Sequence, residues 1–125
     1  LKTPKKTLYI GGDSGYDTHF LEIGNKYGPF DLAILELGQY DKNWKFIHML
    51  PEHFFLAAND LKAQKVMGVH NSKFALGKHS WFDPLETITE LSKESKIPLL
   101  TPMIGEPLNL NDSTQTFTQW WSGRK

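Results

Sequence analysis

The chain contains no cysteine among its 125 residues. It therefore has no disulfide, no thiolate metal site and no cysteine nucleophile, and any metal ion must be bound by His, Asp or Glu. The chain also lacks an excess of charge, because 14 Lys and Arg balance 14 Asp and Glu. Nucleic acids and anionic membranes attract basic proteins, so the composition gives no support to either as a partner.

Long apolar segments are missing as well. No run approaches the roughly 20 apolar residues of a membrane span, and residues 1–6 lack the apolar stretch of a signal peptide. We therefore expect a cytoplasmic protein, with peripheral association with a membrane left open. The chain begins with Leu1 and a Lys-rich stretch instead of Met, and we expect it to be a piece of a longer protein.

The chain has enough apolar material for one globular domain. Hydrophobic residues make up 39% of it and aromatic residues 13%. A chain of this length can bury roughly two-thirds of its unfolded surface. A disordered tail is excluded on the same grounds.

Short β-favouring runs alternate with stretches in which apolar residues recur at helical spacing. The expected strands are residues 7–10, 32–35, 66–69 and 98–100, and the expected helices are residues 18–27, 51–61 and 83–91. This β-α-β-α-β-α-β order, with about 30 residues per unit, predicts the α/β class with mostly parallel strands. Beyond Pro102 the pattern weakens, and we expect an edge strand at residues 107–110 and a helical turn at residues 119–121.

Polar side chains follow three of the expected strands. Asp13 comes after the first strand, His48 lies in the loop after the second, and His70 directly follows the third. The carboxyl ends of parallel strands share one edge of a sheet, so we expect these three side chains to converge. A His/His/Asp set of this kind binds Zn²⁺, Mn²⁺ or Fe²⁺.

Each of these residues also has a purely structural interpretation. Asp13, in Gly-Gly-Asp-Ser-Gly, is a typical turn residue that bonds its own backbone. His70 fits a core imidazole with a backbone partner, and His48 fits a helix-capping or surface histidine. Their common position at one edge favours the functional interpretation for all three.

The other motifs are less informative. We interpret His53 and His19 as surface residues, whereas His79, in the loop after His70, lies either in the same pocket or on the surface. The chain has neither the G-x-G-x-x-G spacing of a dinucleotide site nor a G-x-S-x-G nucleophile elbow.

Five motifs in order carry a resemblance to a known family. They are Tyr-Ile-Gly-Gly-Asp-Ser-Gly-Tyr at 9–16, Gly-Pro-Phe-Asp-Leu-Ala at 28–33, Leu-Gly-Gln-Tyr at 37–40, His-Met-Leu-Pro-Glu at 48–52 and Gly-Val-His at 68–70. Together they resemble the C-terminal half of the metallo-β-lactamase superfamily. The nearest branch is that of the N-acylphosphatidylethanolamine-hydrolysing phospholipase D and its bacterial zinc-dependent relatives. The resemblance runs from about residue 7 to about residue 107.

The resemblance implies a four-layer αβ/βα sandwich, with a mixed sheet and flanking helices, around one or two zinc ions. By the same resemblance, Asp13 is the carboxylate that bridges the metals and His70 is a ligand of the second metal. It makes His48 a catalytic pocket histidine outside the metal's own ligands, and places Tyr40 and His79 at the substrate pocket. The implied activity is that of a hydrolase in which a metal-bound hydroxide attacks a phosphodiester, lactone or amide.

The chain departs from this family in one large respect. The His-x-His-x-Asp-His motif of the N-terminal half is absent, because no two of the five histidines are separated by one residue. We therefore expect residues 1–125 to be the C-terminal half alone, inactive by itself and weak or deficient in metal binding. A non-catalytic binding or scaffold half-domain remains the alternative. A flavodoxin-like ligand binder shares the order of elements but leaves the convergence at one edge unexplained.

A chain that forms only half of the αβ/βα sandwich leaves exposed the sheet face that would pack against the other half. We expect the missing N-terminal half of the same protein as one partner, and a homo-oligomer of this chain as another. The residues expected in the oligomer interface are Ile34, Leu35, Trp120 and Trp121. A small-molecule or lipid-like substrate is expected, and no nucleic acid.

Overall fold

The computed structural model describes residues 1–123. Its strands β1 (Leu8–Ile10), β2 (Leu32–Glu36), β3 (Val66–Val69) and β4 (Leu99–Leu100) form one sheet in the order β1-β2-β3-β4. The helices are α1 (His19–Tyr27), α2 (Phe54–Asp60) and α3 (Asp83–Ser92), with short 3₁₀ helices η1 (Lys42–Trp44) and η2 (Pro51–His53). The predicted α/β class, with its four strands and three helices, is confirmed.

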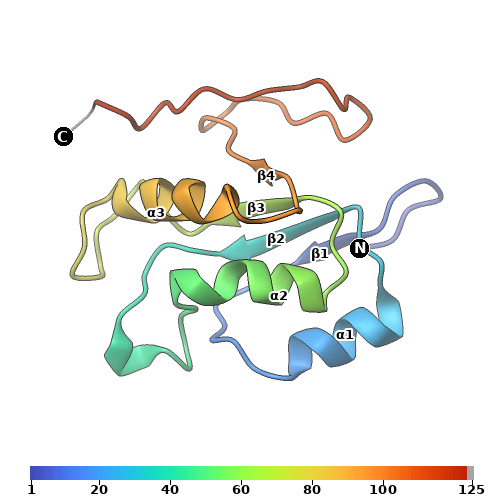
Figure 1. Cartoon of the computed structure of the whole chain (residues 1–125), viewed down its shortest axis with the longest axis horizontal. Coiled ribbons are helices and arrows are strands. Elements are labelled where there is room, and N and C mark those ends of the chain that lie inside the picture. The colour runs from blue at the N-terminus through green and yellow to red at the C-terminus, as the bar shows by residue number, and fades with distance from the viewer. Residues whose placement is uncertain (124–125) are drawn as a thin grey trace.

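Two expectations about the sheet and the C-terminal region need correction. All the strands described in residues 1–123 pair in parallel, so the antiparallel strand of a mixed sheet is not found among them. Residues 107–110 form no strand, and residues 120–123 form a turn instead of a helix. The segment after β4 runs beyond the edge of the sheet with little regular structure (Figure 1).

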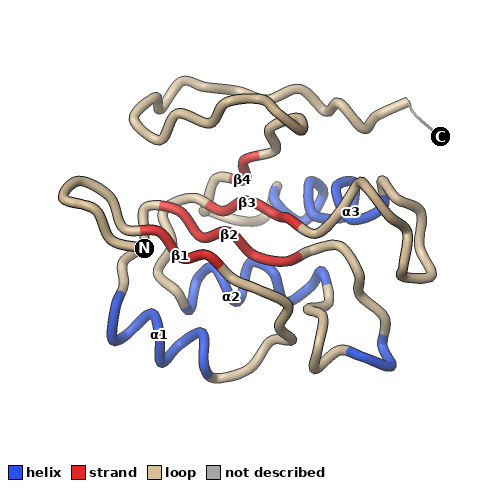
Figure 2. Tube along the Cα trace, turned by 180° about the vertical axis from the view of Figure 1, so that it is seen from behind, coloured by secondary structure: helices blue, strands red, loops and turns tan. Residues whose placement is uncertain are grey.

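The strand order decides where the helices lie. Parallel neighbours joined in sequence by right-handed crossovers place every crossover helix on the same face of a sheet. Figure 1 shows α1, α2 and α3 on the side facing the viewer, and Figure 2 shows the opposite face with the strands in front. The sheet is therefore covered by helices on one side only.

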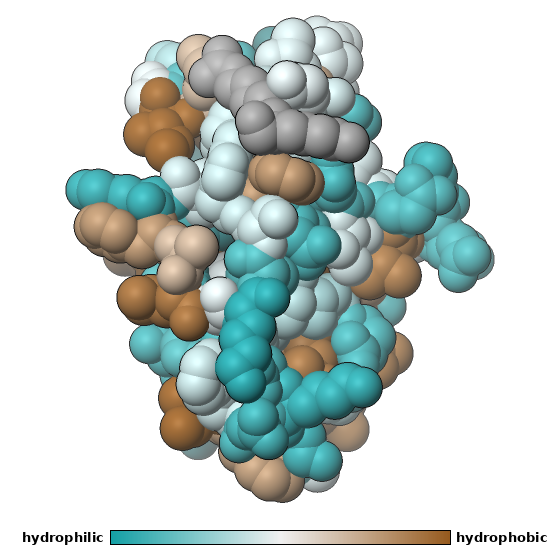
Figure 3. Space-filling model, turned by 90° about the vertical axis from the view of Figure 1, so that its left-hand side faces the viewer, coloured by the Kyte–Doolittle hydropathy of each residue, from teal (hydrophilic) through white to brown (hydrophobic). Residues whose placement is uncertain are grey.

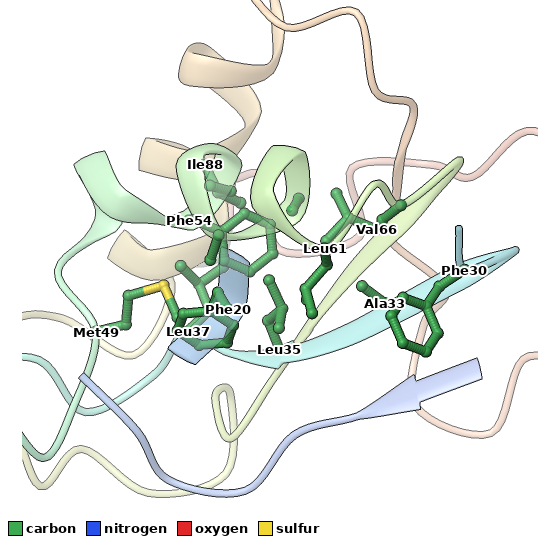
Figure 4. Packing of buried hydrophobic residues seen from close by; sticks show 13 residues of the cluster. Phe20, Phe30, Ala33, Leu35, Leu37, Met49, Phe54, Leu61, Val66 and Ile88 are labelled. Carbon is green, nitrogen blue, oxygen red and sulfur yellow. The ribbon is translucent and has the colours of Figure 1, made fainter. Parts of the chain in front are cut away.

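The hydrophobic core fills the space between this face and the helices. Phe20 of α1, Phe54 of α2 and Ile88 of α3 belong to the same buried cluster as Leu35 of β2. Figure 4 shows these side chains packed together between the helices and β2. A Cβ at Gly24 of α1 would lie 1.9 Å from the Asp60 carbonyl oxygen of α2, so only glycine allows these two helices to pack this closely.

The opposite face carries a row of apolar residues in register. Ile10 pairs with Ile34, Ile34 with Met67, and Met67 with Leu100. Side chains alternate between faces along a strand, so these residues point away from the helices. Ile10 is 60% exposed, and the other three are half-buried.

The predicted oligomer interface is wrong for two of its residues. Leu35 is buried against the helices, and Trp121 is buried by the rest of the chain. Side chains along β2 alternate between faces, and Leu35 falls on the helix side. Ile34 and Trp120 remain partly exposed.

Candidate metal centre

The carboxyl ends of β1, β2 and β3 bring four side chains together at one edge of the sheet. Asp13 lies in the turn after β1, Glu36 ends β2, His48 comes from the loop after β2, and His70 directly follows β3. One potential ligand atom from each residue lies within 4.8 Å of the others. The structure thus brings together Asp13, His48 and His70, and it adds Glu36, which the sequence analysis missed.

Asp13 and His70 form the open side of this cluster. The Asp13 Oδ1 atom lies 3.8 Å from His70 Nε2, and their side chains are 57% and 38% exposed. Solvent, a metal ion or a substrate can therefore reach both groups. His70 has a φ of 66°, a left-handed conformation that is uncommon for residues other than glycine. Backbone strain of this kind gathers at functional sites.

Gly38 allows the chain after β2 to pass against the backbone of His70. A Cβ at Gly38 would lie 1.5 Å from the His70 carbonyl oxygen and 2.8 Å from the Asn71 nitrogen. The neighbouring Gln39 is buried, and its Oε1 accepts hydrogen bonds from the backbone N–H groups of Leu76 and Gly77, both at 2.9 Å. The loop before His48 and the loop after His70 are thereby held together.

Glu36 and His48 form the closed side of the cluster. Glu36 is 2% exposed; its Oε2 lies 3.0 Å from His48 Nδ1, and its Oε1 accepts a hydrogen bond from the Met49 backbone N–H at 2.5 Å. Burial raises the pKa of Glu36 above its ordinary value, although both hydrogen bonds act in the opposite direction. The His48 ring stacks on the His70 ring with centroids 5.5 Å apart.

One signal in the sequence would have pointed to Glu36. The residue directly ends a continuous apolar run and precedes Leu37, which is fully buried. A carboxylate in such a position is rarely buried without a partner. The sequence does not identify His48 as the partner of Glu36, because His48 lies in a loop. It also does not show on which face of β2 the Glu36 side chain lies.

The expected pocket residues Tyr40 and His79 lie together. Their rings stack with centroids 4.2 Å apart, and the Tyr40 hydroxyl donates a hydrogen bond to the Asp83 carboxylate at the start of α3. Burial and the bond to Asp83 raise the pKa of Tyr40. Both residues line a cavity of about 730 Å³, which also includes Leu50 and Leu91.

The remaining histidines lie elsewhere. His19 Nε2 is 3.1 Å from the Ser14 hydroxyl, and its ring packs on Phe20. His53 packs on Tyr16 with ring centroids 5.1 Å apart. Neither belongs to the four-residue cluster.

The donor set suits a transition-metal ion. Two imidazoles and two carboxylates are the ligand types of zinc and of other divalent metals in sites without cysteine. Within residues 1–123, no other group of three or more such side chains has donor atoms converging in this way. In the same part of the chain, every helix is too short or too polar to cross a membrane.

Comparison with known proteins identifies the family. The model of the β-lactamase superfamily domain matches residues 1–71, so the chain belongs to the metallo-β-lactamase superfamily, as the motifs predicted. The outer membrane protein RomA of Klebsiella pneumoniae is 53% identical over 68 residues, covering 54% of this chain and 52% of that protein.

Two longer matches extend the likeness. An uncharacterized protein of Mycobacterium tuberculosis is 31% identical over 121 residues, covering 94% of this chain and 32% of that protein. An N-acyl-phosphatidylethanolamine-hydrolyzing phospholipase D of Caenorhabditis elegans is 31% identical over 90 residues, covering 69% of this chain and 25% of that protein. The chain spans about half or less of the length of these relatives.

A solved structure shares the fold. Igni18, a metallo hydrolase of the archaeon Ignicoccus hospitalis, aligns with a TM-score of 0.54 at 22% identity, covering 73% of this chain and 36% of that one. This likeness supports the arrangement of sheet and helices and carries no information about the substrate.

Proposed function

We propose that residues 1–125 are the C-terminal half of a metal-dependent hydrolase domain that acts on a phosphodiester, lactone or amide. The observation that supports this most directly is the meeting of Asp13, Glu36, His48 and His70 at the carboxyl edge of the sheet, in a chain of this superfamily. We propose zinc as the metal because the donors are imidazole nitrogens and carboxylate oxygens.

In this proposal Asp13 and His70 hold the metal. Both are exposed and 3.8 Å apart, and each has a free electron pair to donate once His70 is neutral. When bound, the metal acts as a Lewis acid and lowers the pKa of coordinated water to about 7. In the same proposal His48, which contacts Glu36 and stacks on His70, contacts the substrate beside the metal.

Tyr40 and His79 belong to the proposed substrate pocket. Their cavity of about 730 Å³ is lined by apolar side chains, including Leu50 and Leu91, and by charged side chains of both signs: Lys42, Lys78, Asp41, Glu52 and Asp83. This mixture fits a small or lipid-like substrate that has a polar group beside its apolar part. The phospholipase D relative named above acts on a molecule of this type by its name, which supports the same choice here.

The helix-free sheet face is the proposed contact with the N-terminal half. Ile10, Ile34 and Met67 form an apolar row there, and burying such a row against a second layer is favourable. Without that layer, a second copy of the chain covers the same row and forms a homo-oligomer. The apolar row on the sheet face differs from the side of the molecule seen in Figure 3, where hydrophobic residues lie in separate small patches among hydrophilic residues.

The test uses the protein in which this chain is joined to its proposed N-terminal half. Zinc content and hydrolysis of a phosphodiester, a lactone and an amide are measured for the parent and for Asp13→Asn and His70→Ala. The matched control is Glu94→Gln, since Glu94 is exposed and distant in sequence from the cluster. We expect both site variants to lose zinc and at least about 100-fold in turnover. Parental zinc content and turnover in both variants would refute the proposal, and zinc loss with no activity in the parent would favour the scaffold alternative.

A further inference from the structure

We propose that Glu36 is a positioning residue: it fixes the His48 imidazole with the proton on Nδ1 and leaves the Nε2 electron pair free at the Asp13–His70 edge. The proposal deepens the proposed function, because it assigns the chemical state in which His48 enters that site. The state of the ring itself is a property of this chain and is measurable without metal or substrate.

Glu36 contacts the loop that carries His48 at two points. Glu36 Oε1 accepts from the Met49 backbone N–H at 2.5 Å, and Oε2 lies 3.0 Å from Nδ1 of His48. His48 and Met49 are consecutive residues of one loop, whereas Glu36 is the last residue of β2. The two contacts therefore fix both the backbone of the loop and the rotation of the ring against a rigid strand.

The protonation state follows from what a carboxylate is able to do. An ionised carboxylate only accepts hydrogen bonds, so a contact of 3.0 Å with Nδ1 requires the ring to carry its proton there. In the neutral ring, Nε2 then holds the free electron pair. Carboxylates that receive the second N–H of a functional histidine set the tautomer and orientation of the ring in the same way.

The burial of Glu36 indicates a role beyond holding the loop at Met49 in place. Glu36 is 2% exposed, and its neighbours Leu35 and Leu37 are fully buried. Burying a charge here is unfavourable. A neutral Gln of nearly the same shape would still accept the Met49 N–H. The carboxylate is required only if the group facing Nδ1 must be an acceptor.

Glu36→Gln tests this reasoning with little change in volume. If the amide oxygen keeps the Met49 N–H, the amide NH₂ faces His48 Nδ1, which must then accept. The proton of the neutral ring consequently moves to Nε2. The measurement is ¹⁵N NMR of the imidazole nitrogens in the metal-free chain at about pH 9, well above the usual histidine pKa.

We expect Nδ1 of His48 to be protonated in the parent chain and in Glu94→Gln, and Nε2 to be protonated in Glu36→Gln. An unprotonated Nδ1 in the parent would overturn the proposal, and so would an unchanged tautomer in a folded Glu36→Gln variant. The parent measurement alone decides the first point even if the variant fails to fold. These outcomes do not depend on whether the protein is a hydrolase.

A second readout separates positioning from simple structural support. In the protein joined to its proposed N-terminal half, we expect Glu36→Gln to lower kcat by about 10- to 100-fold, as for other residues that orient a functional histidine. The unfolding midpoint should remain near that of the parent. Parental kcat in a variant with the altered tautomer would refute a role in positioning.

Discussion

Gly38→Ala should disrupt the candidate site by displacing the backbone of His70. The added Cβ would lie 1.5 Å from the His70 carbonyl oxygen and 2.3 Å from its carbonyl carbon. Because carbon atoms settle at about 3.5–4.0 Å from their neighbours, the two segments must separate by roughly 2 Å. Both contacts are with backbone, so rotation of a side chain provides no relief.

Two magnitudes follow from this displacement. Overpacking of this kind lowers the free energy of unfolding by about 1–3 kcal/mol, and occasionally by more. A functional cluster must be held within about 0.5 Å of its working geometry, so a movement of this size also separates His70 from Asp13. Urea unfolding measures the first effect, and NMR titration with Zn²⁺ measures the second.

Gly12→Ala is the matched control. Gly12 immediately precedes Asp13, and a Cβ there would meet no atom within 4 Å. We expect this variant to keep the parental stability and the parental response to zinc. If Gly38→Ala is no less stable than Gly12→Ala and responds to zinc in the same way, the close approach of the two loops at His70 is refuted.

Three further predictions concern the scaffold. Gly24→Ala should lower the free energy of unfolding by about 1–3 kcal/mol in urea denaturation, because the added Cβ would lie 1.9 Å from the Asp60 carbonyl oxygen. In an unobstructed helix the same substitution usually raises stability by about 1 kcal/mol. A gain in stability here would contradict the close packing of α1 and α2. The Thr7 backbone N–H, at 2.7 Å, lowers the pKa of Asp31 below 3.8, so its stabilising contribution is present above that pH and is lost as the pH falls through the lowered pKa. Asp31→Asn should therefore be less stable than the parent at pH 7, by under about 1 kcal/mol, and equally stable in strong acid; a difference independent of pH would refute this. Tyr40→Phe removes the hydroxyl that bonds the carboxylate at the start of α3, and thermal denaturation should show a loss of about 1–2 kcal/mol, whereas an unchanged midpoint would argue against that bond.

The sequence predicted the elements well where local rules decide them. Apolar runs such as residues 32–35 and the Pro-containing helix starts at Pro51 and Pro84 require no knowledge of distant parts of the chain. The edge of the sheet that gathers Asp13 and His70 followed from the order of elements alone.

The remaining features depend on tertiary contacts. Glu36 acquires its role from a loop that folds back 12 residues later, and no local pattern specifies that return. Trp121 was expected at an interface but is buried by the chain itself. Residues 107–110 have a local propensity for a strand but form none, because strand formation also requires a tertiary partner.

The most direct test of the account is an NMR titration with Zn²⁺ of the protein in which this chain is joined to its proposed N-terminal half, because such a titration detects weak as well as tight binding. We predict that the signals of Asp13, His48 and His70 change together, and that Asp13→Asn abolishes the change at all three. A response centred on His19, His53 or His79, or no response at the edge of the sheet, would contradict the claim that these distant residues form one cation site.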